Sequence, residues 1–198
     1  MTKNDIITLA WKGTHLNNPY HNLKHCTDVY NWCEKILEFE HATMSVELKF
    51  ASLLHDYNHS GGYFDDNYNI PEAIRHICEG PIKDAIDNSG ADASTIVKLI
   101  HVTRFVDGGF PDEPQTLEEM AIRDADLMTS FLPLEEAIEA LNGLHTEFLI
   151  HFPDMTKEHF WKGNVKFMQN AKFYTLYGNI MKEQLDERLK LLEAHWYG

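Results

Sequence analysis

The sequence predicts an all-α protein, and three observations lead to this prediction. Apolar residues recur at three- and four-residue steps over most of the chain, which is the spacing of one helix face. No segment alternates apolar and polar residues in the manner of a half-buried strand. Proline, glycine and helix-capping residues divide the pattern into pieces of helical length. Without an internal repeat or a low-complexity linker, residues 1–198 are expected to form a single compact multi-helix domain.

Five helices are expected in the first half of the chain. Pro19 and Pro71 suit the first turn of a helix, so each is expected to open one. Thr43 or Ser45 can cap the third helix, and a glycine pair ends it near Asp56. The expected ranges are about 5–13, 19–39, 46–56, 71–79 and 82–86.

Four further helical segments are expected in the second half. Thr116 and Glu119 form a capping box whose helix leads into Asp126. The last helical stretch is expected to break at Gly178. The expected starts are Asp92 or Ser94, Thr116, Pro133 and Thr156, and the helix from Pro133 runs to about Ile150.

The composition narrows the classes of partner. The formal net charge is −14 with no basic stripe, which opposes binding to a nucleic acid polymer. No uncharged run is long enough to cross a bilayer, and residues 1–5 lack the apolar core of a signal peptide. Cys26, Cys33 and Cys78 are an odd and scattered set, which favours free thiols in a reducing compartment. A cytoplasmic protein without a membrane partner is therefore expected, in an oligomeric state that the sequence leaves open.

Four residues have the chemistry of a metal-ligand set: His25, His55, Asp56 and Asp126. Imidazole and carboxylate groups bind zinc, manganese and iron and, with water, magnesium. His55 and Asp56 are expected at a helix C-terminus, where the negative end of the helix dipole favours a cation. Asp56 could bridge two metals with its two oxygens, so one or two divalent ions are expected. Such ions activate water for attack on phosphorus and offset phosphate charge, which would reconcile an acidic protein with a small phosphorylated substrate.

Most of the remaining histidines fall into three groups. His21 and His59 each lie four residues from an expected ligand, so each can share that ligand's helix face. His101 lies in an apolar run and is expected to be a core histidine, with a role at a second metal as the alternative. Six further histidines are expected to be surface or hydrogen-bonded core residues: His41, His76, His145, His151, His159 and His195.

These motifs resemble the HD-domain superfamily of metal-dependent phosphohydrolases. The superfamily pattern of a His, a His-Asp pair and a distant Asp corresponds here to His25, His55-Asp56 and Asp126. Within it, the segments Tyr20-His21-Asn22 and His55–Gly61 are similar to class I cyclic nucleotide phosphodiesterases. The resemblance covers roughly residues 19–130. It implies a phosphodiesterase-like helical fold, and hydrolysis of a phosphodiester such as a 3',5'-cyclic nucleotide through a metal-activated water.

The resemblance also implies roles for single residues. His21 would be the general acid that protonates the leaving oxygen, and His59 would hold a metal-bound water. Glu72 falls where the family has a glutamate that orients waters or ligands, although an exposed first-turn charge is an equal alternative. The chain departs from the family at Asn58 and Ser60, where the phosphodiesterases usually have Asp and Pro.

Nucleotide recognition rests on three residues. Tyr20 is expected on the substrate-binding side of the first motif, and Gln169 and Phe173 would clamp a base from one helix face. A solvated Gln169 is the alternative. Arg75 and Arg104 could contact phosphate or form structural ion pairs.

Three other functions stay open. The first is a nucleotide phosphomonoesterase of the same superfamily, and the second is a non-catalytic metal- or nucleotide-binding regulator. The third is a metal-dependent oxygenase on an HD-like core.

Overall fold

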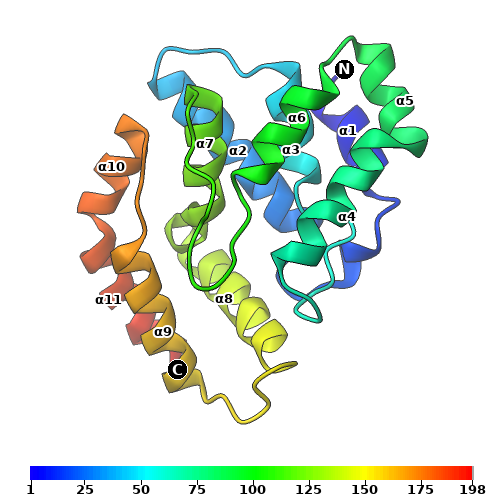
Figure 1. Ribbon diagram of the computed structural model, residues 1–198. Coiled ribbons are helices and arrows are strands. Elements are labelled where there is room, and N and C mark those ends of the chain that lie inside the picture. Colours follow the sequence, from blue (N-terminus) through cyan, green and yellow to red (C-terminus); the bar gives the residue numbers. More distant parts are fainter. Residues whose placement is uncertain (198) are drawn as a thin grey trace.

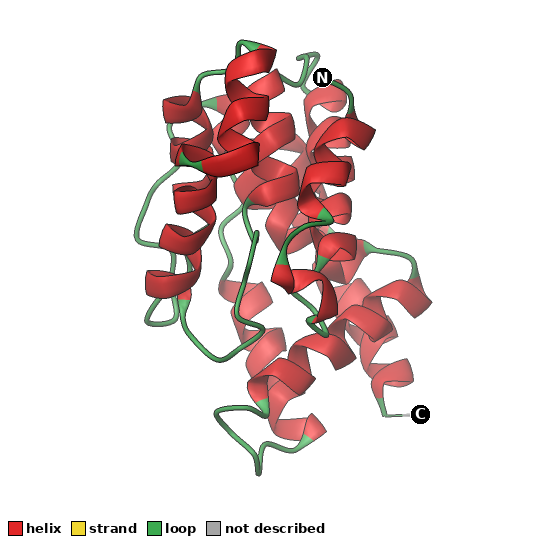
Figure 2. Cartoon of the chain, turned by 90° about the vertical axis from the view of Figure 1, so that its right-hand side faces the viewer, coloured by secondary structure: helices red, strands yellow, loops and turns green. Residues whose placement is uncertain are grey.

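The computed structural model describes residues 1–197, and all of their regular secondary structure is helical. Figures 1 and 2 show helices joined by loops, with no strand among the described residues. The all-α prediction is therefore confirmed. Within this range no helix is both long and apolar enough to cross a membrane. All three cysteines are free, as expected, and Cys26 and Cys33 are buried.

Eleven α-helices and two 3-10 helices, η1 and η2, follow one another along residues 1–197. The first group is α1 (Lys3–Ala10), η1 (Thr14–Asn17), α2 (Leu23–Phe39), α3 (Val46–Leu54), α4 (Asp66–Cys78), α5 (Gly80–Ser89) and α6 (Ala93–His101). The second group is α7 (Leu117–Asp126), η2 (Leu127–Phe131), α8 (Leu134–Phe148), α9 (Lys157–Asn170), α10 (Leu176–Glu183) and α11 (Leu185–Trp196).

Of the three expected proline starts, Pro133 caps α8 as predicted, but Pro19 and Pro71 do not begin their helices. Asn22 caps α2, because its side chain accepts from the backbone N–H groups of Lys24 and His25, and Pro19 lies before the helix. The α4 helix begins at Asp66, capped by Asp65, so Pro71 lies inside it. Proline forfeits one backbone hydrogen bond there, but capping and the buried face of α4 outweigh that loss.

The last helical stretch also differs from the prediction. It breaks at residues 171–175, between α9 and α10, and Gly178 lies inside α10. The carboxylate of Asp124 makes the break, since it accepts hydrogen bonds from the backbone N–H of Tyr174 and from both the backbone N–H and hydroxyl of Thr175. Thr175 in turn caps α10. These hydrogen bonds from α7 to residues 174 and 175, which the local pattern does not encode, set the position of the break.

The apolar interior consists of two clusters, and the site lies where they meet. The first cluster is built from α1 to α7 and ends at Ala125; the second begins at Leu127 and is built from η2 and α8 to α11. Asp126, between them, is the last residue of α7. The α2 helix packs against both α3 and α7 (Figure 1), which brings its first turn to the C-terminal ends of those helices.

Candidate metal and catalytic site

The four expected metal ligands meet at three helix ends. His25 lies in the first turn of α2, His55 and Asp56 follow the last turn of α3, and Asp126 ends α7. All except Asp126 are buried, and the Asp126 side chain is 19% exposed. We call these four residues the ligand group. The structure therefore brings together residues that lie up to a hundred positions apart in the sequence.

The two histidines of the ligand group lie close to both of its carboxylates. Nε2 of His25 lies 3.1 Å from Oδ1 of Asp126 and 3.4 Å from Oδ2 of Asp56. Nε2 of His55 lies 3.1 Å and 3.6 Å from the same oxygens of Asp56 and Asp126, and the two Nε2 atoms are 3.4 Å apart. Ligands at about 2.0–2.1 Å from a tetrahedral zinc ion stand about 3.3 Å from one another. The ligand atoms of His25, His55 and Asp56 all lie within 4.8 Å of one another, so these three residues could hold one divalent cation, with Asp126 beside the two histidines.

The hydrogen bonding of the ligand group agrees with this fit. Nδ1 of His55 lies 3.1 Å from the carbonyl oxygen of Ser52 and donates to it, so a neutral ring presents the lone pair of Nε2 to the group. Oδ2 of Asp56 is buried and accepts no hydrogen bond. Such an orphaned acceptor is costly unless a cation or a donor faces it.

The pKa values of His55 and Asp56 show that positive charge is favoured between them. Burial opposes charge on the His55 ring, yet the facing carboxylate of Asp56 raises the pKa of His55 well above its usual value. Burial likewise opposes charge on Asp56, but the His55 charge holds the pKa of Asp56 well below its usual value. Protons on the two rings would leave His25 and His55 nitrogens facing each other. One cation among His25, His55 and Asp56 would face their ligand atoms at once.

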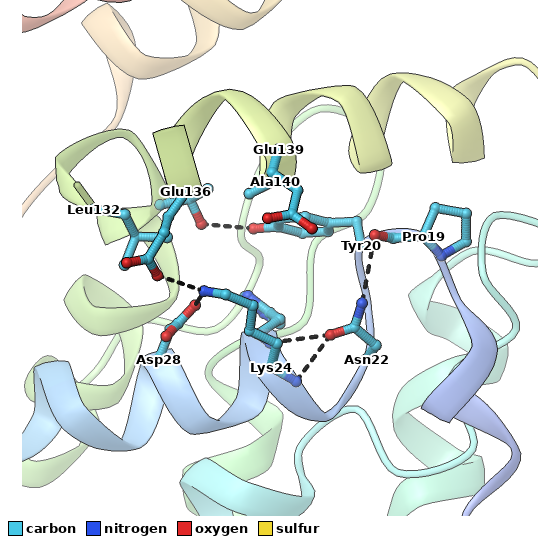
Figure 3. Close-up of a pocket in the computed structure, with 11 residues that line it drawn as sticks. Pro19, Tyr20, Asn22, Lys24, Asp28, Leu132, Glu136, Glu139 and Ala140 are labelled. Atoms are coloured by element: carbon cyan, nitrogen blue, oxygen red, sulfur yellow. Dashed lines mark hydrogen bonds and ion pairs between the residues drawn. The ribbon is translucent and has the colours of Figure 1, made fainter. Parts of the chain in front are cut away.

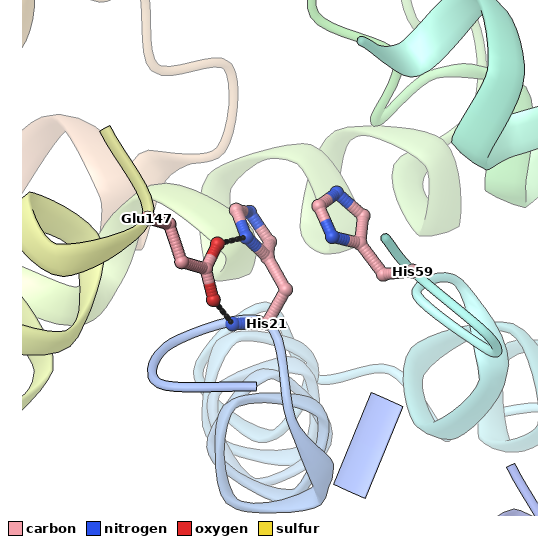
Figure 4. Close-up of side chains that lie close together, drawn as sticks. All are labelled: His21, His59 and Glu147. Atoms are coloured by element: carbon pink, nitrogen blue, oxygen red, sulfur yellow. Dashed lines mark hydrogen bonds and ion pairs between the residues drawn. The ribbon is translucent and has the colours of Figure 1, made fainter. Parts of the chain in front are cut away.

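A second set of side chains is here called the acid group and consists of His21, His59 and Glu147 (Figure 4). It lies beside the ligand group, since the ring centroids of His21 and His25 are 5.8 Å apart. Nδ1 of His21 lies 2.5 Å from Oε2 of Glu147. Oε1 of Glu147 accepts from the backbone N–H groups of Tyr20 and His21, at 2.8 Å and 3.0 Å. The His59 ring stacks on the His21 ring with centroids 3.8 Å apart.

Backbone contacts fix this stack. Nδ2 of Asn18 donates to the carbonyl oxygens of both His21 and His59, at 3.0 Å and 2.8 Å. Gly61, two residues after His59, has φ +65°, and a Cβ there would stand 2.5 Å from Oδ1 of Asn18. Only glycine fits this close approach without strain. The turn after α3 therefore places the two rings together.

The two stacked rings differ in basicity. Burial alone would lower the pKa of His21, but its hydrogen bond and charge pairing with Glu147 raise it to about 9. Burial lowers the pKa of His59, and the neighbouring His21 charge lowers it further. At neutral pH the proton of the pair thus lies on His21, which suits it to donate a proton.

Both ring nitrogens of His59 already face a donor. Nδ1 accepts from the backbone N–H of Gly61 at 3.1 Å, and Nδ2 of Asn69 lies 2.9 Å from Nε2. The expected role of His59, holding a water, would need one of these nitrogens. A neutral imidazole accepts at only one of these nitrogens, so the role of His59 in holding a water stays a prediction.

Sequence reasoning missed two residues of this site. Glu147 lies 126 positions from its partner His21, and its only local signal is a carboxylate just before the apolar run Phe148–Ile150. Asn69 lies on the buried face of α4, in a stretch that the proline rule assigned to a loop. A glutamate at position 147 and an asparagine at position 69 do not stand out from the other polar residues of the sequence.

The expected substrate residues are separated in space. Tyr20 lies at the site, with its ring 4.7 Å from those of His21 and His25 and its hydroxyl bonded to Thr129. Gln169 is exposed on α9 and donates to Asp186 of α11. Phe173 lies beyond the end of α9 and is buried in the second apolar cluster. These two residues therefore do not share a helix face, which corrects that expectation.

The remaining candidates form structural contacts. Glu72 accepts two hydrogen bonds from Arg75, whose guanidinium lowers the pKa of Glu72 to about 2, and it also faces Asn58. Arg104 pairs with Asp112. The ion-pair alternative is thus correct for both arginines. His101 is exposed, so its assignment to the core was wrong.

A small cavity of about 50 Å³ borders the ligand group between α2 and α8 (Figure 3). Tyr20, His25 and Thr129 contribute to its lining. Lys24 closes one side, since its ammonium contacts both Asp28 on α2 and Glu136 on α8 at 2.8 Å. The cavity is large enough for water and too small for a nucleotide.

In comparisons with known proteins, no family, curated protein or solved structure matches this chain.

Proposed function

We propose that this protein is a metal-dependent phosphohydrolase of the HD-domain type. The arrangement that carries the proposal is the ligand group beside the acid group. It combines a place for a divalent cation with a buried carboxylate–histidine pair that holds a proton. The favoured substrate is a phosphodiester such as a 3',5'-cyclic nucleotide.

A divalent cation in the ligand group would lower the pKa of a water molecule and offset the charge of a bound phosphate. The chain supplies the other requirements of hydrolysis. In the overall reaction the water oxygen forms a bond to phosphorus, and the bond from phosphorus to the ester oxygen breaks. The leaving oxygen takes a proton from His21, whose Nδ1 is engaged by Glu147, so Nε2 delivers the proton. General acid catalysis of this kind contributes about 10²–10⁴-fold.

The acid group is better suited to a proton than to a second cation. Glu147 is 2% exposed and uses both carboxylate oxygens for N–H donors of Tyr20 and His21. A cation bound to Glu147 and His21 would have to replace the bond between them. We therefore infer that one cation suffices for the proposed reaction.

Turnover and product identity test the proposal. Purified protein supplied with Mn²⁺, Mg²⁺ or Zn²⁺ is incubated with cyclic AMP, cyclic GMP and nucleoside monophosphates. Asp56→Ala is the inactive variant, and Asp84→Ala, an exposed position on α5, is the matched control. We expect opening of the cyclic phosphate, lost in Asp56→Ala alone.

Other outcomes separate the alternatives. Release of inorganic phosphate from monophosphates alone would identify a phosphomonoesterase. Oxygen consumption with reduced iron would identify an oxygenase. Metal binding without turnover of any phosphate ester would contradict the proposal and favour a regulator.

A further inference from the structure

Asp56 lies in a turn rather than in a helix. The α3 helix ends at Leu54 with His55 as its C-cap, so Asp56 is beyond the last helical residue. The backbone N–H of His59 donates to the carbonyl oxygen of Asp56 at 2.9 Å and closes the turn. Asn58, inside it, has φ +60°, a left-handed conformation that asparagine tolerates better than most residues. We call residues 55–59 the ligand turn, because its shape decides where the Asp56 carboxylate lies.

A segment near the start of the chain is bonded to the ligand turn. Oδ1 of Asn58 accepts from the backbone N–H of Thr14 at 2.8 Å and from its hydroxyl at 3.2 Å. The backbone N–H of Asn58 donates to Nδ1 of the fully buried His15 at 3.3 Å. Asn18, just after η1, donates to the carbonyl oxygen of His59 at 2.8 Å. Residues 14–18 therefore hold the ligand turn at two of its residues.

We propose that Asn58 is a positioning residue that, through Thr14, keeps the ligand turn in the shape that presents Asp56 to a cation. Oδ2 of Asp56 is buried and has no hydrogen-bond partner, so no hydrogen bond at that atom fixes the carboxylate. Its position depends on the backbone that carries it. The proposal rests on the cation site of the proposed function. Loss of a residue that orients a metal ligand typically weakens metal binding by about 10–100-fold.

Zinc titration of the whole protein by calorimetry tests this inference from both sides of the contact. Asn58→Gly removes the side chain but keeps a residue that adopts left-handed backbone freely. Thr14→Pro removes the N–H and the hydroxyl that Asn58 accepts. Proline suits the first residue of η1, because Gly13 before it is extended with ψ 155°. Each variant should raise the zinc Kd by about tenfold or more.

The double variant shows whether the two residues act through one contact. Asn58→Gly and Thr14→Pro remove the same hydrogen bonds, so the double variant should lose less affinity than the product of the two single losses. Losses that multiply would mean that the residues act separately, which would overturn the proposal. An unchanged zinc Kd in both single variants would also overturn it. If Asn58→Gly does not fold, Thr14→Pro, at an exposed position, decides.

Glu118→Ala is the matched control, at the opposite end of α3. Glu118 accepts from the backbone N–H and the hydroxyl of Ser45, at 2.9 Å and 2.8 Å, so this variant also loses two hydrogen bonds between distant segments. It should lower Tm and leave the zinc Kd unchanged. A rise in Kd as large as that of Asn58→Gly would mean that any loosening of α3 weakens the site, and Asn58 would have no particular role.

The zinc titration does not depend on turnover, so the two proposals can fail separately. Zinc binding that weakens in Asn58→Gly, without turnover of any phosphate ester by the wild type, would retain the positioning role and reject the hydrolase. Turnover by the wild type with an unchanged zinc Kd in Asn58→Gly and Thr14→Pro would reject the positioning role alone. A wild-type protein that binds no zinc would overturn both.

Discussion

The ligand group and the acid group contain the same kinds of side chain, but their hydrogen bonding is opposite. In the ligand group, lone pairs of His55 and Asp56 face a common point, and Oδ2 of Asp56 has no donor. In the acid group, both oxygens of Glu147 have donors, and His21 already carries the compensating charge. The difference favours a cation at the first group, where an acceptor lacks a donor, while the second group holds its positive charge as a proton on His21.

The largest expected effect separates the two groups through Asp56. In Asp56→Asn the central charge and one ligand atom are lost, so zinc binding and turnover should fall to background. A cation present at a hundred times its Kd stabilises a protein by ~2.7 kcal/mol, so the zinc-dependent rise in Tm should also disappear. Thermal unfolding with and without zinc measures this loss.

Asp124→Asn is the matched control for that variant. Asp124 is equally buried and lies two residues from Asp126, but it binds the backbone of Tyr174 and Thr175. Its loss should lower Tm without removing the zinc-dependent rise. A zinc response in Asp56→Asn as large as that of the wild type would show that the ligand group does not bind the cation.

The next effect concerns the acid alone. His21→Gln removes the proton donor but none of the four ligand atoms, so kcat should fall about 10²–10⁴-fold. Zinc affinity, measured by calorimetry, should stay close to that of the wild type. Equal losses of zinc affinity and turnover would mean that His21 is itself a ligand of the cation. The ligand group and the acid group would then form one metal centre.

A smaller effect is a shift in pH dependence. Glu147→Gln removes the carboxylate that raises the pKa of His21 from 6.5 to about 9. Because the folded-state pKa is raised, the stability from this pair is complete below about pH 6.5 and is lost as the pH rises through about 9. Wild-type stability should therefore fall across that range more steeply than that of Glu147→Gln.

Urea unfolding at several pH values measures this slope, and the alkaline limb of kcat should move in the variant from near pH 9 toward 6.5. Glu139→Gln, an exposed position on α8, is the control. Parallel stability curves for the wild type and Glu147→Gln would indicate that His21 is not held by Glu147 in solution.

The sequence predicted those parts of the fold and site that depend on neighbouring residues. The capping box of Thr116 and Glu119, and the caps Ser45 and Asp92, begin helices where expected. The ligand group could be predicted because histidine and aspartate side chains at helix ends have few structural reasons to occur together. The proline rule failed at Pro71, because the cap at Asp65 and the buried face of α4 begin that helix earlier.

The unpredicted parts depend on tertiary packing. Glu147 reaches His21 only because the end of α8 packs against the turn before α2. Gln169 and Phe173 are four apart, which would place them on one face of a continuous helix, but α9 ends at Asn170. Residues four apart share a face only while the helix continues. The end of α9 is set by contacts outside its own sequence, so the spacing of Gln169 and Phe173 does not place them together.

The smallest expected effect is at Gln169. Its amide donates to Asp186 on the outer surface formed by α9 and α11, and it makes no contact with either histidine group. Gln169→Ala should therefore change KM and kcat for a cyclic nucleotide by less than about twofold, the equivalent of ~0.5 kcal/mol for a surface substitution. Lys190→Ala, which changes the same surface, is the matched control. A tenfold rise in KM confined to Gln169→Ala would mean that α9 moves over the site when substrate binds, and base recognition would then return to the position that the family resemblance implied.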